Sequence, residues 1–201
     1  MKEALGIYGC KYIFNLGSGR PIVLLHGYSF TYRVWHEIGL LDRLVSEDIS
    51  FIAPDMPYGR ENSCKNKISS SDENINILRR IIQENFGDEI PVLVGASLGG
   101  YICLRYGMRY DVYGMVLIAP VWSTRGDIID VYREKSIPIL LIYGDRDSIV
   151  GMDEMTRFKD EVSSTELKIY RGAKHPAYLD YPNDFIEDII NFYRVRLGLR
   201  Y

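Results

Sequence analysis

The chain has 201 residues, of which 47% are hydrophobic and 25% are charged, with a formal net charge of −3. This composition is typical of a soluble globular chain that can bury a sizeable core in one domain, residues 1–201. Scattered Lys and Arg without a basic patch argue against nucleic acid as a partner, and no apolar run approaches the ~20 residues of a membrane span.

Strand and helix patterns alternate along the chain. Strands are predicted over residues 11–16, 22–27, 49–55, 90–96, 112–120, 136–144 and 166–172. Helices are predicted over residues 33–47, 74–86, 98–110, 127–134, 152–162 and 183–197. The middle and late strands are nearly continuous runs of Val, Ile and Leu, which is typical of parallel strands buried on both faces. The alternation therefore predicts an α/β fold, a doubly wound sheet with helices on both faces.

In such folds the functional residues follow the carboxyl ends of the strands. The predicted strands deliver to that edge His26-Gly27-Tyr28, Asp55, Ser97, Pro120, Asp145 to Asp147, and His175. A serine, an aspartate and a histidine thus reach one edge in that chain order. Ser97 stands in Gly-Ala-Ser-Leu-Gly between a strand and a helix, where small residues permit a sharp turn and the helix N-terminus favours an anion.

Five segments resemble motifs of the α/β-hydrolase superfamily, and together they cover nearly the whole chain. They are VLLHGYSFTYRVW (23–35), APDMPYGRENS (53–63), LVGASLGG (93–100), ILLIYGDRDSIV (139–150) and GAKHPAYLDYPNDF (172–185). The resemblance implies an α/β-hydrolase fold with a mostly parallel sheet, its usual first strands reduced to one candidate strand. It also implies a catalytic triad in the chain order Ser, Asp, His.

The resemblance assigns Ser97 as nucleophile, His175 as base and Asp147 as the acid that orients the base. A serine hydroxyl needs a base, and histidine is suited to that task near neutral pH. Asp145 is expected to cap the same turn, and Asp127 is a rival acid.

The oxyanion hole is expected to consist of the backbone N–H groups of Tyr28 and Leu98. His26 is expected to brace the oxyanion segment without transferring protons. His36, in the middle of a predicted helix, is expected to be an ordinary surface or partly buried histidine.

The cysteines are Cys10, Cys64 and Cys103, which lie far apart and form no CxxC pair. We therefore expect no disulfide and no zinc site, a reducing cytoplasm as the location, and Cys103 in the core. No metal-ligand cluster and no GxGxxG or P-loop motif is present, so neither a metal nor a cofactor is expected.

The segment between the strands at 112–120 and 136–144 limits what can cover the nucleophile. It has room for one helix of ~8–10 residues plus loops, and Ile128, Ile129 and Tyr132 have the spacing to pack on the sheet. We expect a shallow cleft without a cap domain that prefers short acyl groups. The polar segment 58–74 is expected to be a mobile surface loop that could fold over the rim.

The sequence thus predicts a serine hydrolase, carboxylesterase-like, that cleaves an ester or related acyl bond of a small-molecule substrate through an acyl-enzyme. The same triad could serve a thioester, an amide or the carbon–carbon bond of a diketone, and the fold could also be a non-catalytic binding module. The natural substrate and the oligomeric state are left open.

Overall fold

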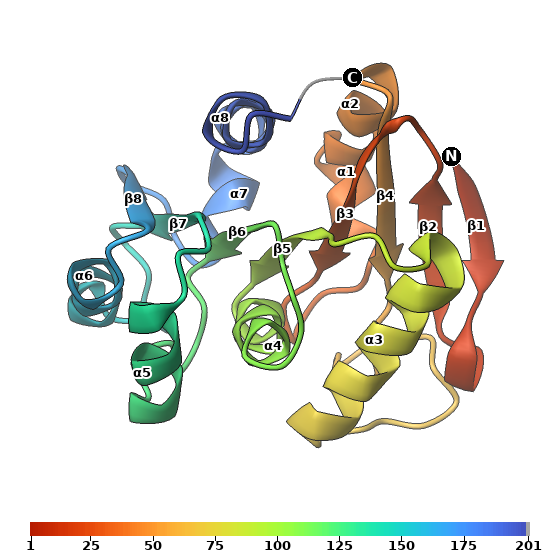
Figure 1. The fold of residues 1–201 in the computed structure, drawn as a ribbon, viewed down its shortest axis with the longest axis horizontal. Coiled ribbons are helices and arrows are strands. Elements are labelled where there is room, and N and C mark those ends of the chain that lie inside the picture. Colours follow the sequence, from red (N-terminus) through yellow and green to blue (C-terminus); the bar gives the residue numbers. More distant parts are fainter. Residues whose placement is uncertain (200–201) are drawn as a thin grey trace.

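The computed structural model describes residues 1–199 and is organised around an eight-stranded sheet (Figure 1). The strands are β1 (Lys2–Leu5), β2 (Lys11–Asn15), β3 (Gly19–Leu25), β4 (Ile49–Pro54), β5 (Val92–Ala96), β6 (Gly114–Ile118), β7 (Ile139–Gly144) and β8 (Thr165–Tyr170). Their order in the sheet is β1-β2-β4-β3-β5-β6-β7-β8. Strands β3 to β8 form the parallel part of the sheet, and β1-β2 and β2-β4 pair antiparallel, which confirms the mostly parallel sheet.

Helices cover both faces of the sheet, as predicted (Figure 1). One face carries α1 (Val34–Glu37), α2 (Leu40–Ser46), α7 (Ala177–Asp180) and α8 (Pro182–Asn191), which continues into the π-helical turn η2 (Phe192–Arg196). The other face carries α3 (Ser71–Phe86), α4 (Leu98–Gly107), α5 (Gly126–Glu134) and α6 (Met152–Glu161).

Each face of the sheet has its own hydrophobic core, and β3 contributes to both. Ile22 and Leu24 pack with the first set of helices, whereas Val23 and Leu25 pack with the second set. Successive side chains of a strand point to opposite faces, so a strand buried on both sides must be apolar at every position. This explains why the apolar run of β3 does not alternate with polar residues.

Three local features differ from the prediction, one of them the short helix α7, which no predicted helix covers. The helix predicted over 33–47 is divided into α1 and α2, because Gly39 between them has φ 83°, a left-handed conformation that interrupts the helix. Two strands precede β3 where the sequence suggested one, since β1 and the short 3-10 helix η1 (Ile7–Gly9) were missed. Strand β1 lies at the sheet edge and is largely exposed, so it lacks the apolar pattern that reveals a strand.

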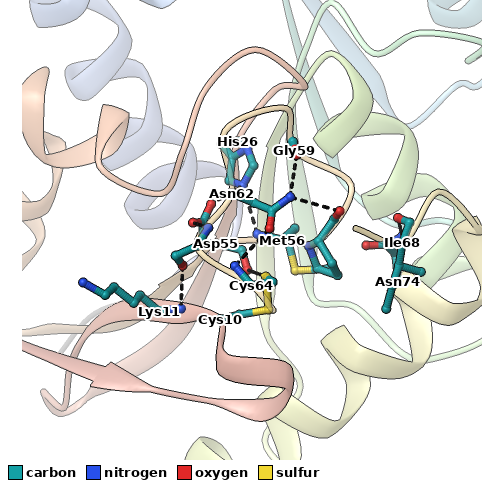
Figure 2. The surroundings of a disulfide bond; sticks show 12 residues. Cys10, Lys11, His26, Asp55, Met56, Gly59, Asn62, Cys64, Ile68 and Asn74 are labelled. Carbon is teal, nitrogen blue, oxygen red and sulfur yellow. Dashed lines mark hydrogen bonds and ion pairs between the residues drawn. A yellow bond between two sulfur atoms is a disulfide. The ribbon is translucent and has the colours of Figure 1, made fainter. Parts of the chain in front are cut away.

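The expectation of no disulfide is wrong, because Cys10 and Cys64 are joined by a disulfide bond (Figure 2). The bond links the segment before β2 to the loop between β4 and α3. Spacing alone does not reveal a pair that is separated by 54 residues and brought together by the fold. The expectation of a reducing cytoplasm rested on the absence of disulfides and is no longer supported, since disulfides persist mainly in oxidising environments. Cys103 is a free thiol buried in the core, as predicted.

Within residues 1–199, no helix combines the length and the apolar character needed to cross a membrane.

Candidate active site

Ser97 lies between β5 and α4 on a backbone turn with φ 52° and ψ −114°. A non-glycine residue at positive φ is strained and persists only where its surroundings impose the conformation. A Cβ on Gly99 would come within 2.4 Å of the Leu25 carbonyl oxygen, and one on Gly95 within 2.7 Å of the Gly99 carbonyl oxygen. The small residues around the serine are therefore required by the close approach of the turn to β3 and to its own helix.

Asp147 and His175 form a short hydrogen bond at the same edge of the sheet. His175 Nδ1 lies 2.6 Å from Asp147 Oδ2, and the aspartate side chain is 1% exposed. The second carboxylate oxygen, Oδ1, accepts hydrogen bonds from the N–H groups of Ile149 (2.7 Å) and Val150 (3.0 Å). With Nδ1 donating to the carboxylate, His175 Nε2 is left as a proton acceptor.

Burial and hydrogen bonding act in opposite directions on the pKa of Asp147. Desolvation raises this pKa, but the hydrogen bonds from His175 and from the N–H groups of Val150 and Ile149 lower it by more in total. The net pKa lies below its ordinary value, so the carboxylate is ionised near neutral pH. The ionised carboxylate accepts a hydrogen bond from the imidazole N–H of His175 and so holds the ring in one orientation.

Ser97 and His175 make no hydrogen bond among the contacts of residues 1–199. Catalytic hydrogen bonds in substrate-free enzymes are commonly long and tighten when substrate binds. The structure thus joins the predicted acid to the predicted base, and it places the predicted nucleophile on the turn after β5 of the same sheet, with β6 between β5 and β7.

The two rival acidic residues contact other partners. Asp145 Oδ1 accepts a hydrogen bond from the Gly172 N–H at 2.5 Å, so this carboxylate ties the turn to the next loop. Asp127 on α5 pairs with Arg105 at 2.8 Å and with Arg125 at 3.3 Å. Within residues 1–199, neither carboxylate bonds to His175.

Ser97 opens into a cleft of about 540 Å³. The cleft is lined by Tyr28, Tyr58, Ser69, Ser71, Ser97, Leu98, Tyr101, Ile102, Val121, Trp122 and Arg125. Helix α5 has nine residues, and its Ile128, Ile129 and Tyr132 are buried on the core below the sheet. Among the described residues, the segment between β6 and β7 thus forms no separate cap domain, as predicted: α5 packs on the core, and only the turn before it, with Val121, Trp122 and Arg125, reaches the cleft.

Ser69, Ser71 and Arg125 line the cleft although no sequence motif singles them out. The two serines flank the cap of α3, and the arginine precedes the first residue of α5. These positions come to lie near the turn at Ser97, hereafter the elbow, only through the crossover connections of the fold. The one hint in the sequence is that these residues belong to loops beside the carboxyl edge of the sheet.

The two backbone groups predicted as oxyanion donors have no hydrogen-bond acceptor among the described residues. Leu98 is the first residue of α4, where N–H groups lack partners within the helix. Tyr28 lies in the turn after β3, and its carbonyl accepts a hydrogen bond from the Arg60 N–H at 2.7 Å. Both N–H groups are therefore available to a substrate oxygen.

His26 is fully buried, and both of its ring nitrogens are engaged. Nδ1 lies 2.8 Å from the Gly27 carbonyl oxygen, and Nε2 accepts a hydrogen bond from the Met56 N–H at 3.0 Å. These contacts agree with a bracing role rather than proton transfer. His36 is half exposed on α1 and lies 3.7 Å from Asp42, as an ordinary surface histidine does.

Within residues 1–199, no three or more His, Cys, Asp or Glu side chains are grouped so that they could hold a metal ion.

Comparisons with known proteins identify the family. The model of the alpha/beta hydrolase family matches residues 22–133, and the chain belongs to this family. Protein ABHD14A of Danio rerio is 32% identical over 173 residues, which cover 85% of this chain and 63% of that protein. Human ABHD14B, whose name marks it as a proposed protein-lysine deacylase, is 26% identical over 184 residues, covering 88% of this chain and 85% of that protein.

A crystal structure of a hydrolase of Thermoplasma acidophilum, predicted to be CIB-like, superposes with a TM-score of 0.82 at 23% identity and covers 96% of this chain and 97% of that one. This likeness shows the shared fold. The chain spans less than two thirds of the length of the ABHD14A protein it matches.

Proposed function

We propose that the chain is a serine hydrolase that cleaves an ester or related acyl bond of a small substrate through a Ser97–His175–Asp147 triad. The observation that carries the proposal is the 2.6 Å bond between His175 and the buried Asp147, at the sheet edge where the strained Ser97 turn opens into a cleft. The base is oriented by an ionised acid, and it keeps a free acceptor nitrogen.

In the proposed reaction, Ser97 Oγ attacks the substrate carbonyl carbon while His175 Nε2 takes the hydroxyl proton. The carbonyl oxygen becomes an oxyanion, which accepts hydrogen bonds from the N–H groups of Tyr28 and Leu98. Collapse of the tetrahedral intermediate expels the leaving group, which receives the proton from His175. Water then attacks the acyl-enzyme by the same sequence and releases the acid and free Ser97.

Asp147 holds the imidazole and stabilises its positive charge without taking the proton. Its two hydrogen bonds from the Ile149 and Val150 N–H groups keep the carboxylate from turning away. The imidazole therefore keeps one orientation, in which His175 Nε2 can take up and return the proton in each turnover.

The cleft favours a small, partly apolar acyl group. Tyr101 and Trp122 meet edge to face at 5.1 Å, and with Tyr28 and Tyr58 they give the cleft an aromatic lining. Arg125 is its one charged lining residue among those described. A small acyl group can rest on this wall while its carbonyl faces the oxyanion donors.

A second candidate is hydrolysis of an acyl-lysine amide by the same triad. It is favoured by the similarity to human ABHD14B, whose name carries the proposed protein-lysine deacylase activity. An amine leaves less readily than an alkoxide and requires protonation by His175 during departure, a step the triad supplies.

The test combines labelling with turnover. A fluorophosphonate probe should attach to Ser97, and Ser97→Ala should abolish both labelling and hydrolysis of chromogenic esters while the circular dichroism spectrum is unchanged. A panel of matched esters, thioesters and acetyl-lysine peptides then ranks the bond types by kcat/KM. Labelling at another serine, or near-normal turnover by Ser97→Ala, would refute the triad, and an unreactive wild type would favour a binding module.

A further inference from the structure

The loop that follows β4 is tied at one end to the N-terminal hairpin. We call residues 55–64 the brace loop. Its last residue, Cys64, forms the disulfide with Cys10, next to β2 (Figure 2). Hydrogen bonds accompany the covalent link, because the Lys11 N–H donates to Ser63 Oγ at 2.9 Å and the Asp55 N–H donates to the Lys11 carbonyl at 2.8 Å.

The other side of the brace loop contacts the oxyanion segment after β3. The Met56 N–H donates to His26 Nε2 at 3.0 Å, and the Tyr58 hydroxyl donates to the His26 carbonyl oxygen at 2.6 Å. The Arg60 N–H donates to the Tyr28 carbonyl oxygen at 2.7 Å. The loop thus holds the residues on both sides of the peptide that joins Gly27 to Tyr28.

That peptide carries the proposed oxyanion donor. The Gly27 carbonyl and the Tyr28 N–H belong to one rigid planar unit. His26 Nδ1 bonds to this carbonyl at 2.8 Å, and the direction of the carbonyl determines the direction of the N–H. The His26 ring therefore aims the Tyr28 N–H, and the brace loop holds the ring in place.

The packing around the ring leaves little room for adjustment. His26, Asp55 and Met56 are each at most 1% exposed. A Cβ on Gly59 would lie 2.7 Å from the His26 ring, so the loop backbone presses directly on the imidazole. Asp55 Oδ2 accepts a hydrogen bond from the N–H of Ser63, the residue beside Cys64, so release of Cys64 would free that contact too.

We propose that the Cys10–Cys64 disulfide is a positioning device for the oxyanion hole, so that reduction of this bond by a dithiol lowers the rate of acyl transfer. The proposal rests on the proposed serine hydrolase function. Cys10 and Cys64 touch no reacting atom and act only through the brace loop and His26.

The redox step is an ordinary thiol–disulfide exchange. One thiolate of the dithiol attacks the Cys64 sulfur, because Cys64 is partly exposed whereas Cys10 is 2% exposed. The S–S bond breaks, Cys10 leaves as a thiolate and takes a proton, and a mixed disulfide forms at Cys64. The second thiol of the reductant closes its own disulfide and releases Cys64 as a thiol, so two protein thiols form as one dithiol is oxidised.

The experiment compares the oxidised protein, the protein reduced with dithiothreitol, and a Cys10→Ser/Cys64→Ser double variant. Kinetics are measured on a short-chain oxygen ester and on its thionoester, whose sulfur is a poor acceptor for an oxyanion hole. Outright removal of one oxyanion donor lowers kcat by about 10²–10³, so a displaced donor should lower kcat at least about tenfold. The oxygen-ester to thionoester ratio of kcat/KM should fall with it.

The controls separate positioning from folding. The double variant should show the lowered kcat without dithiothreitol and no further response to it. Circular dichroism and a thermal melt of each form identify an assay temperature at which all forms are folded. Mass spectrometry after alkylation verifies that Cys10 and Cys64 carry the reduced thiols.

Two results would overturn the inference. One is an unchanged kcat in a folded, fully reduced protein; the other is a fall in kcat with an unchanged oxygen-ester to thionoester ratio. Failure of the proposed function is distinguishable, because the oxidised protein would then show no Ser97-dependent hydrolysis and no fluorophosphonate label at Ser97.

Discussion

Replacement of Asp147 by asparagine tests the acid without changing the shape of the site. The two carboxylate oxygens have different surroundings: Oδ2 faces His175 Nδ1, whereas Oδ1 accepts from the N–H groups of Ile149 and Val150. In Asp147→Asn the amide oxygen can occupy only one of these places. The surroundings therefore decide which way the amide points.

The orientation that keeps the loop bonds places the amide NH₂ against His175. The flipped orientation forfeits the hydrogen bonds from Ile149 and Val150, at about 1 kcal/mol each, and so costs about 2 kcal/mol. That difference favours the unflipped orientation about thirtyfold. The NH₂ can only donate, so His175 Nδ1 must become the acceptor, and the ring proton moves to Nε2. A protonated Nε2 cannot take the proton of Ser97.

We therefore expect kcat of Asp147→Asn to fall by about 10⁴, the loss typical of this change in a Ser-His-Asp triad. The assay is steady-state hydrolysis of a short-chain chromogenic ester, with a thermal melt to verify folding. The matched control is Asp145→Asn in the same turn, which loses the acceptor of the Gly172 N–H and should alter stability more than kcat. The assignment is wrong if Asp145→Asn is the inactivating change or if Asp147→Asn keeps a tenth of the rate.

The pH dependence of the free energy of unfolding provides a second test of Asp147. Folding lowers the pKa of Asp147 below its ordinary value of 3.8. The contribution of the carboxylate to stability is therefore complete above that value and is lost as the pH falls through the lower folded-state pKa. The gap in free energy of unfolding between wild type and Asp147→Asn should accordingly narrow below pH ~4.

Three further outcomes are expected from other parts of the molecule. Gly99→Ala should destabilise the chain and remove activity, because its Cβ would lie 2.4 Å from the Leu25 carbonyl oxygen. A Cβ at Gly126 on α5 would meet nothing within 4 Å, so Gly126→Ala should raise the free energy of unfolding in denaturant by about 0.5–1 kcal/mol. Reduction of Cys10–Cys64, whose residues are 54 apart in the chain, should lower the free energy of unfolding by up to about 4 kcal/mol; an unchanged denaturation midpoint would refute this. In an ester series, kcat/KM should peak at short acyl chains, since each methylene gains ~0.8 kcal/mol only where a wall buries it; a steady rise to long chains would contradict the expectation of a shallow cleft.

The sheet and the serine turn could be predicted because they leave strong local marks in the sequence. Strands buried on both faces must be apolar throughout, and a turn pressed against β3 must use residues as small as Gly95 and Gly99. The order of Ser97, Asp147 and His175 followed from the resemblance, and the contact between Asp147 and His175 agrees with it.

The features that the sequence did not reveal depend on contacts between distant segments. Cys10 lies beside Cys64 in a structure where β2 pairs with β4, two segments far apart in the chain, and the exposed edge strand β1 carries no apolar pattern. Arg125 enters the cleft because the crossover from β6 to α5 passes beside the elbow. Periodicity reports which residues are buried, but it does not report which distant loops become neighbours.

The two proposed oxyanion donors belong to elements that are joined by backbone contact. Leu98 begins α4, and the next residue, Gly99, sits so close to the end of β3 that even a Cβ would meet the carbonyl oxygens of Leu25 and His26. Tyr28 follows the same strand end and is aimed through His26. The spacing between the donors therefore depends on main-chain packing, and their own side chains are free to serve the cleft. The turn at Ser97 is anchored by backbone packing on the end of β3, whereas the Tyr28 N–H is aimed through the His26 side chain. A disturbance of the His26 ring from the brace loop is therefore expected to turn the Tyr28 N–H before it displaces the nucleophile.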